Sequence, residues 1–365
     1  MPGVYISYPF CRQKCTFCNF ASGVAGPEAI AGYERALLTE LRAQNWPQNW
    51  PWTPETLYFG GGTPSLISPA FLHELTEAIP GRPWAEATLE CAPGALKPER
   101  AADWLANGIN RISLGVQSFI TAELRQTGRT HTAEIVESEI AMLRRAGLTN
   151  INIDLIAGLP GQTAASWEQS LDWIARINPP HVSVYIFEVD EDSRLGNEIL
   201  LEGVRYGARR VPSDDLVAQL YERAVDRLAQ LGWHRYEISN FARPGCESRH
   251  NLKYWRLEPY LGFGLDAHSF DGGQRWANTD SLEAYIAQPL NHIHQTVTNP
   301  SEERFFVGLR LAEGITPAPG EWERFSQPIA RWLEAGMLEK HGPQLRLTPA
   351  AVLLSNEIFQ DFLHA

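Results

Sequence analysis

Three cysteines lie close together near the start of the chain, at Cys11, Cys15 and Cys18. Thiolates are the usual ligands of iron–sulfur clusters. A loop with the spacing C-x-x-x-C-x-x-C wraps one corner of a cubane and supplies three of its four iron ligands. The fourth iron is then open to an exchangeable small molecule. We therefore predict a [4Fe–4S] cluster on these three cysteines.

The alternative interpretations of the cysteine loop are a zinc site and three unrelated buried cysteines. Structural zinc has four closed ligands, and His73 or His131 would have to complete the set. Nothing in the sequence places either histidine beside the loop. Cys91 and Cys246 are isolated, and we expect them to be small hydrophobic residues or bystanders. Clustered cysteines in a chain without an export signal indicate a metal site before they indicate disulfides.

Short apolar segments alternate with helical patterns over the first half of the chain. The expected strands are Val4–Ser7, Thr56–Phe59, Ala87–Glu90, Arg111–Val116, Ile151–Ile156 and His181–Phe187. The expected helices are Glu28–Asn45, Ala70–Ile79, Pro98–Ala106, Thr132–Ala146 and Ala165–Ile177. Repeated strand–helix units predict an α/β fold with a parallel sheet. Six units fall short of the eight that close a (β/α)8 barrel, so we expect a partial (β/α)6 barrel.

The unusual residues of the sequence sit where the expected strands end. The cysteine loop follows the first strand, and Gly60-Gly61-Gly62-Thr63-Pro64 follows the second. Glu90 ends the third strand, Gln117 follows the fourth, and Asp154 lies within the fifth. In barrels of this kind the chemistry gathers at the C-terminal ends of the strands. These residues are therefore expected to form one site at one barrel mouth.

The pattern changes after about residue 195. We expect residues 1–195 to form the barrel, 196–300 a helical and polar-aromatic extension, and 301–365 a small C-terminal α+β region. Pro212–Leu231 is expected to be one long helix, and Tyr236–Ser269 is the polar-aromatic stretch. A possible hairpin at Met337–Leu347, with helices around it, gives the last region a winged-helix-like pattern. We favour a structural role for it over nucleic-acid binding.

The cysteine loop directly after a first strand, with Phe17 before the third cysteine, resembles the radical S-adenosylmethionine (SAM) superfamily. The resemblance implies that the open iron binds the amino and carboxylate groups of SAM, and that an electron donor serves the cluster. It also implies that the GGGTP segment lies along the SAM methionyl group. Glycines lack Cβ, so the backbone there can approach a ligand closely.

Further motifs narrow the resemblance to the group that contains oxygen-independent coproporphyrinogen III oxidase and its HemW-type relatives. The matching segments are Tyr5–Cys11, Gly115–Phe119, Gly128–His131 and Asn152–Thr163. The resemblance implies a set of SAM contacts: Tyr5, Phe17, Gly61, Gly62, Thr63, Glu90, Gln117, Arg129 and Asp154. Their chemistry suits the ligand, because the carboxylates can accept from the SAM ammonium or hydroxyls and Arg129 can pair its carboxylate.

Two departures separate this chain from the oxidase. The oxidase loop continues with a further cysteine, where this chain has Phe20, and only ten residues precede Cys11. Both departures are shared with the HemW-type proteins, which are thought to bind and hand on heme. We therefore expect a heme chaperone that is not a functional coproporphyrinogen III dehydrogenase. The alternatives are the oxidase, which decarboxylates propionates to vinyls, and another radical SAM activity with an unrelated substrate.

The segment Arg249–Trp255 resembles the H-N-x-x-Y-W motif of the HemW branch. The resemblance implies heme binding by His250, Tyr254 and Trp255, since histidine is the commonest proximal heme ligand and the aromatic faces suit a porphyrin. Arg249 or Lys253 could pair a propionate, and His268 is a second candidate ligand. The alternative is a hydrogen-bonded cluster in the core.

Charge and composition limit the classes of partner that the chain can have. The net charge of −12 gives no support to bulk binding of nucleic acid. The N-terminus has no signal-peptide pattern, and no run of about 18 apolar residues predicts a membrane span. We expect a cytoplasmic protein. The resemblance implies heme-acceptor proteins, such as respiratory enzymes, as partners, and a possible homodimer.

Overall fold

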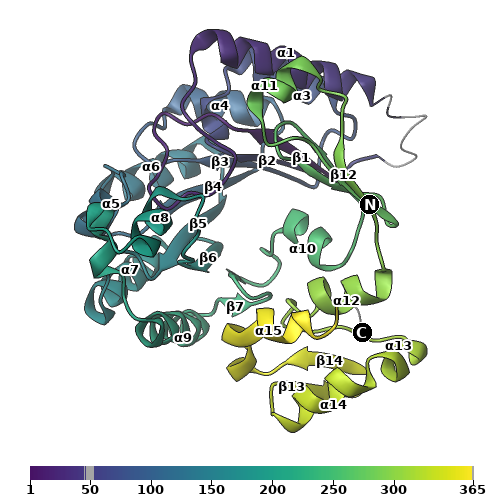
Figure 1. Cartoon of the computed structure of the whole chain (residues 1–365). Helices are drawn as coiled ribbons and strands as arrows, with labels where there is room; N and C mark the ends of the chain where they lie inside the picture. Colours follow the sequence, from purple (N-terminus) through teal and green to yellow (C-terminus); the bar gives the residue numbers. More distant parts are fainter. Residues whose placement is uncertain (45, 47–52, 364–365) are drawn as a thin grey trace.

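Six parallel strands follow one another in the chain and in the sheet, and helices join each strand to the next (Figure 1). The structure is a computed structural model that describes residues 1–44, 46 and 53–363. The six strands are β1 (Gly3–Tyr8), β2 (Thr56–Gly61), β3 (Glu86–Cys91), β4 (Arg111–Gln117), β5 (Asn150–Ala157) and β6 (His181–Ile186). The joining helices are α1 (Pro27–Ala43), α3 (Pro69–Ala78), α4 (Pro98–Ala106), α5 (Thr121–Gln126), α6 (Ala133–Ala146) and α7 (Ala164–Ile177).

The predicted α/β fold with six strand–helix units is confirmed, and most boundaries agree to within two residues. Asn45, the expected end of the first helix, lies outside the described residues. The short helix α5 was not expected; it precedes α6 in the β4–β5 connection. Six residues carry too few apolar positions to show a helical period.

Strands from residues 196–300 extend the same sheet at both edges. The full order is β12-β11-β10-β9-β1-β2-β3-β4-β5-β6-β8-β7. Strand β9 pairs with β1 in parallel, and β8 pairs with β6 antiparallel. The added strands are β7 (His234–Arg235), β8 (Asn240–Ala242), β9 (Tyr260–Phe263), β10 (His268–Phe270), β11 (Gln274–Ala277) and β12 (Ile293–Val297). These strands were not predicted, because strands of two to five residues show little alternation.

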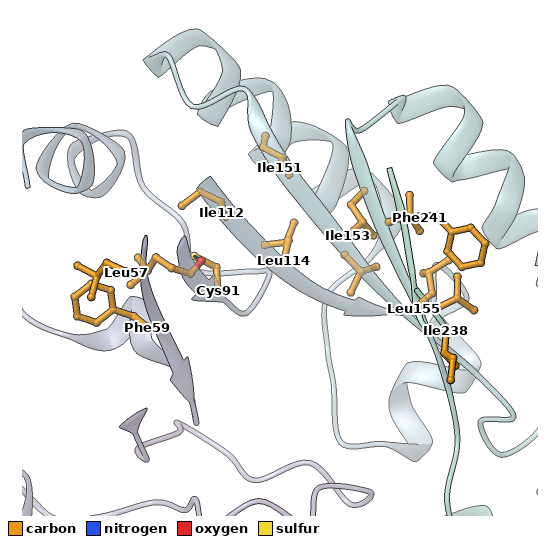
Figure 2. Packing of buried hydrophobic residues seen from close by; sticks show 14 of the residues in the cluster. Leu57, Phe59, Cys91, Ile112, Leu114, Ile151, Ile153, Leu155, Ile238 and Phe241 are labelled. Carbon is orange, nitrogen blue, oxygen red and sulfur yellow. Dashed lines mark hydrogen bonds between the residues drawn. The ribbon is translucent and has the colours of Figure 1, made fainter. Parts of the chain in front are cut away.

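The core lies between the sheet and the helices that cover it. Figure 2 shows apolar side chains of β2, β4 and β5 in this layer, with Cys91 among them. Cys91 is only 5% exposed, which agrees with its expected role as a small hydrophobic residue. Trp104 of α4 and Trp167 of α7 are buried on the helix side. This apolar layer fixes the helices and leaves the other side of the strands for polar residues.

The remaining helices belong to the second half of the chain. They are α8 (Arg194–Leu200), α9 (Asp214–Gln230), α10 (Arg249–Trp255) and α11 (Leu282–Ala287). In the C-terminal region α12 (Pro300–Gly308), α13 (Pro319–Arg324), α14 (Ser326–Glu334) and α15 (Ser355–Gln360) surround a hairpin. The hairpin strands are β13 (Leu338–His341) and β14 (Gln344–Leu347), at the position predicted. Among the described helices, none has the length and apolar character needed to cross a bilayer.

Candidate functional site

The cysteine loop leaves β1 at the C-terminal end of the parallel strands. Cys11, Cys15 and Cys18 are free thiols, each partly buried. The backbone N–H of Leu195, at the start of α8, donates a 2.7 Å hydrogen bond to the carbonyl of Thr16 inside the loop. The Asn19 amide donates a 2.6 Å bond to Asp190, in the segment after β6. The loop is thus held against the strand end of β6, a contact that the sequence did not predict.

The glycine segment after β2 packs directly against the cysteine loop. A Cβ on Gly62 would lie 2.6 Å from the carbonyl carbon of Pro9, so only glycine fits there. The N–H of Gly62 donates to the carbonyl of Tyr8 at 2.9 Å. The Thr63 hydroxyl donates to the Cys11 thiol at 3.4 Å. The glycine segment therefore helps to hold the cysteine loop in place.

The three thiols are close enough to affect one another. Burial raises the pKa of the Cys11 thiol, a hydrogen bond from Thr63 opposes the rise, and the charges of Cys18 and Cys15 add to it. Bound iron would relieve the repulsion among three thiolates. Three thiols on one short loop also match the donor set of a cubane with one open iron. These residues fit a [4Fe–4S] cluster.

The histidines considered as fourth zinc ligands are engaged elsewhere. His73 Nδ1 lies 3.1 Å from the side-chain oxygen of Asn107. His131 Nε2 lies 3.1 Å from the carbonyl of Val116, and burial lowers its pKa to about 4. Across residues 1–44, 46 and 53–363, no three His, Cys, Asp or Glu side chains are gathered to hold one metal ion. A single zinc would need its ligands within about 4 Å of one another.

Each of the six parallel strands leaves at least one position partly exposed in an otherwise buried run. These positions include Tyr5, Tyr58, Glu90, Gly115, Asp154 and Tyr185. Burial raises the pKa of the Tyr185 hydroxyl, and the negative charges of Asp154 and Glu90 raise it further. These side chains therefore face a common space. Tyr58 and Tyr185 were missed, although the period-two alternation places them on the same face as the predicted residues.

Two carboxylates in this space carry raised pKa values. Burial raises the pKa of Glu90 to about 7, and the charge of Asp154 contributes to the rise. The Tyr58 hydroxyl donates to Glu90 Oε1 at 2.8 Å. Burial also raises the pKa of Asp154, against hydrogen bonds from Asn152 and Ser183. A cationic ligand between these two partly buried carboxylates would stabilise both as anions, and the ammonium and sulfonium of SAM are cationic.

Gln117 and Arg129 each hold a buried polar atom without a hydrogen-bond partner. The atoms are Gln117 Oε1 and Arg129 Nε. Arg129 Nη1 already donates to the carbonyl of Gly115 at 2.5 Å. Gln117 has a φ of 69°, at the bulge between β4 and β5. Unpaired buried groups and strained backbone both gather at ligand sites, so this acceptor and this donor fit a polar ligand such as SAM.

The remaining expected SAM residues lie on the same strands and loop. The ring of Tyr5 stacks on that of Tyr58, with centroids 6.0 Å apart. Burial raises the pKa of Tyr5, so it stays a neutral hydroxyl. Gly61 has a φ of 103°, a conformation that favours glycine. Phe17 is partly exposed within the cysteine loop.

The expected heme residues lie at the opposite end of the strands. His250 is fully buried in α10, and a Cβ on Gly3, the first residue of β1, would lie 3.1 Å from its ring. Its Nδ1 lies 2.8 Å from Thr56 Oγ1, and its Nε2 lies 2.8 Å from the Tyr254 hydroxyl. Burial lowers the pKa of His250 to about 3. Both ring nitrogens are engaged, so the structure matches the alternative of a hydrogen-bonded core cluster.

Helix α10 packs against β2 and α12, and in Figure 1 it lies between the sheet and the C-terminal region. The buried Glu86 carboxylate, at the start of β3, accepts from the backbone N–H groups of Arg249 and His250, each at 3.0 Å. Arg111 lies 4.0 Å from the same carboxylate. An anion at a helix N-terminus is stabilised by the unpaired N–H groups there. The motif therefore has a structural role that its residue types did not reveal.

Two other residues of the α10 motif pack against neighbouring segments, although the buried indole nitrogen of Trp255 has no hydrogen-bond partner. Lys253 is buried and pairs with Glu55 at 2.8 Å and Glu258 at 3.0 Å. Trp255 packs under the Arg310 guanidinium, 4.5 Å from the ring centroid. Arg310 comes from the loop after α12, so Trp255 joins the barrel to the C-terminal region.

The chain is similar in sequence and in fold to several known proteins. Residues 5–174 match the model of the Radical SAM superfamily. The chain is 32% identical over 375 residues to "Heme chaperone HemW" of Lactococcus lactis, covering 98% of this chain and 96% of that one. It is 32% identical over 387 residues to the protein of the same name from Bacillus subtilis, covering 100% and 99%. In fold it is similar to coproporphyrinogen III oxidase (HemN) from Escherichia coli, with TM-score 0.83 and 23% identity over 99% of this chain and 90% of that one.

Proposed function

The chain belongs to the HemW family within the radical SAM superfamily, and from this membership we propose that it binds heme and passes it to acceptor proteins. The observation that carries the proposal is the similarity along nearly the whole length of two proteins named heme chaperones. A similarity confined to the barrel would support the [4Fe–4S] cluster and SAM as cofactors, but not a role in carrying heme. The C-terminal region, which is included in the match, is shared as well.

The superfamily implies a [4Fe–4S] cluster and SAM. We assign the cluster to Cys11, Cys15 and Cys18, whose free thiols and short spacing fit it. When bound, the reduced cluster would supply the electron that cleaves SAM. The chain itself contributes the placement of the ligand and its shielding from water.

We assign SAM to the polar space between the strands. Glu90 and Asp154 accept from its ammonium or its hydroxyls, and Arg129 pairs its carboxylate. The unpaired Gln117 oxygen is a further acceptor. The remaining contacts are Tyr5, Phe17, Gly61, Gly62 and Thr63. Ligand binding would satisfy polar atoms that are buried without partners, which is the strongest support for this assignment.

The partners follow from the same proposal. An electron donor has to approach the cysteine loop, where Phe20 is 64% exposed. Heme-acceptor proteins, for which respiratory enzymes are the expectation, and a second copy of the chain are further partners. We place the protein in the cytoplasm, where its free cysteines would stay reduced.

A side-by-side assay tests the function. Anaerobic protein reconstituted with iron, sulfide and SAM is divided between a heme assay and a turnover assay. The first follows hemin binding and then its transfer to an apo-heme protein; the second follows coproporphyrinogen III. We expect heme binding and transfer without porphyrinogen turnover. Robust formation of protoporphyrinogen would replace the chaperone with the oxidase, whose fold this chain shares.

A further inference from the structure

His268 lies in an exposed position at the end of the sheet that carries the cysteine loop. Strand β9 is parallel to β1, so Phe263 lies at the same end as the loop. Strand β10 begins at His268 and returns antiparallel, with Phe270 opposite Tyr260. The His268 side chain is 66% exposed, whereas its neighbours Ala267 and Ser269 are each 1% exposed.

The connection between β9 and β10 is anchored to β1 close to the cysteines. A Cβ on Gly264 would lie 2.7 Å from the carbonyl oxygen of Ser7. The Tyr33 hydroxyl donates to that same carbonyl at 2.5 Å, and it accepts from the N–H of Leu265 at 3.1 Å. Ser7 is four residues before Cys11. The connection therefore lies beside the strand that leads directly into the cysteine loop.

The rest of the connection is equally fixed. The buried Glu40 accepts from the N–H of Gly264 at 2.8 Å. The backbone N–H of Asp266 donates to the carbonyl of Thr279 at 2.9 Å, and that of Asn278 donates to Ala267 at 2.9 Å. A side chain on a rigid backbone loses only its own rotamer freedom when it binds a ligand, because the backbone is already ordered. The His268 side chain is thus exposed to solvent on a backbone that is already held in place.

Asp266 adds a carboxylate beside the imidazole. Its Oδ1 lies 4.0 Å from His268 Nε2. Its charge also reaches the interior, because it contributes to the raised pKa of Tyr5 after burial and Glu90. Histidines that bind metals commonly donate their second N–H to a carboxylate, which makes the ligand more basic. The 4.0 Å separation is longer than a hydrogen bond, so Asp266 would take this role after a small rotation of the exposed imidazole.

Four other histidines differ from His268 in burial, hydrogen bonding or position. His250 and His181 are buried with both ring nitrogens hydrogen-bonded. His234 is exposed but lies at the opposite end of the sheet, since its partner Ala242 pairs with the first residue of β6. His292 lies at the cluster end, with Nδ1 2.8 Å from the side-chain oxygen of Asn278.

We propose that His268 is the protein ligand of the iron of bound heme, with Asp266 as its positioning residue. The inference deepens the proposed function and rests on it, because heme as cargo comes from the family. Phe20 and Val24, in the segment that follows β1 at this end, are exposed apolar side chains. The heme would then be held on the side of the barrel that carries the cluster, away from α10.

Hemin titration of the full chain tests the inference, with the Soret band and the EPR spectrum of ferric heme as readouts. We compare wild type with His268→Ala, His250→Ala, His292→Ala and the exposed control His234→Ala. His268→Ala is expected to weaken hemin binding at least about tenfold and to remove the histidine-ligated spectrum. Added imidazole should restore that spectrum in His268→Ala. Asp266→Asn should shift the spectrum while keeping histidine ligation.

The outcomes separate this inference from the proposed function. Wild type that binds hemin, together with an unchanged spectrum in His268→Ala, would overturn the role of His268 and leave the chaperone intact. Loss of the histidine spectrum in His292→Ala or His250→Ala, with His268→Ala unaffected, would move the ligand to that residue. Wild type that fails to bind hemin would remove the proposed function itself.

Discussion

The Thr63 hydroxyl donates a hydrogen bond to the Cys11 thiol at 3.4 Å, across a separation of 52 residues. The bond joins the two motifs on which the proposed cofactor site depends. It also opposes the effect of burial, which raises the pKa of that thiol. Hydrogen bonds to cluster sulfurs help to set reduction potentials. Thr63 is therefore placed to tune the proposed cluster as well as to contact the proposed SAM.

Replacing Thr63 by valine keeps the shape of the side chain and removes the donor. We expect the cluster to assemble and its reduction potential to become more negative by on the order of 50 mV, since a lost hydrogen bond to a charged group is about 1.5 kcal/mol. Potentiometric titration followed by EPR measures the change. Thr63→Ser, which keeps the hydroxyl, is the matched control. A potential equal to wild type in Thr63→Val would show that the bond does not act on the cluster.

Replacing Gly62 by alanine tests the contact between the glycine segment and the cysteine loop. The new Cβ would lie 2.6 Å from the carbonyl carbon of Pro9, so the loop has to move. We expect a lower iron content after reconstitution and a loss of about 1–3 kcal/mol in the free energy of unfolding. Gly23→Ala, in the same loop, meets no atom within 4 Å and serves as the control. Equal iron content in both variants would contradict the prediction.

The three cysteines should be required for the chromophore, and the other two should not. Cys11→Ala, Cys15→Ala and Cys18→Ala each remove one of three iron ligands, so we expect loss of the brown absorbance after anaerobic reconstitution. Cys91→Ala, in the core, and Cys246→Ala are the controls that should keep it. Absorbance and iron analysis give the readout. A cluster of normal content in any of the first three variants would remove the assignment.

The fold and the cofactor loop could be predicted because both depend on local patterns. The six central strands are apolar and β-branched and alternate with helical segments, and the cysteine spacing is complete within eight residues. Strands β8 and β9 could not be predicted, since three or four residues give no period and their pairing is set by β6 and β1. Short strands at sheet edges form because the sheet is already there.

The environment of His250 could not be predicted for a different reason. Its residue type and its aromatic neighbours suit a heme ligand, but burial and hydrogen bonding are tertiary properties. Its Nδ1 partner, Thr56, is 194 residues away in the sequence. The exposure of His268 depends in the same way on Glu40 and Tyr33, which hold the preceding loop from a distant helix. The sequence identifies histidines that are candidate heme ligands, but it does not show which of them are buried and which are exposed.

His250 should contribute more to stability than to heme binding. Its folded pKa of about 3 is below the ordinary value of 6.5, so the unfolded chain binds a proton that the folded chain does not. Stability from the neutral ring is therefore present above pH 6.5 and is lost as pH falls toward 3. His250→Ala should lower the free energy of unfolding by about 3 kcal/mol at pH 7, because two hydrogen bonds and a packed ring are lost. Urea unfolding measures it, with the exposed His234→Ala as control; equal stability would contradict the burial.

Glu40 should give the free energy of unfolding a pH dependence opposite to that given by His250. It is buried on α1 and accepts hydrogen bonds from Gly264 at 2.8 Å, Asn278 at 2.7 Å and Tyr285 at 2.5 Å. Burial nevertheless raises its pKa to about 7. Because the folded state holds this proton more tightly than the unfolded chain, its contribution to stability is fully present below pH 4.5 and is lost as pH rises to 7.

The Glu40→Gln variant keeps the shape and removes the titration. We expect wild type to lose about 3 kcal/mol through this group between pH 4.5 and 7, and the variant to lack that share of the slope. Glu28→Gln, exposed on the same helix, should leave the slope unchanged. Urea unfolding of anaerobic protein at intervals across this range gives both curves. Parallel curves for wild type and Glu40→Gln would show that Glu40 stays ionised in the fold, and that the support beneath His268 does not depend on its proton.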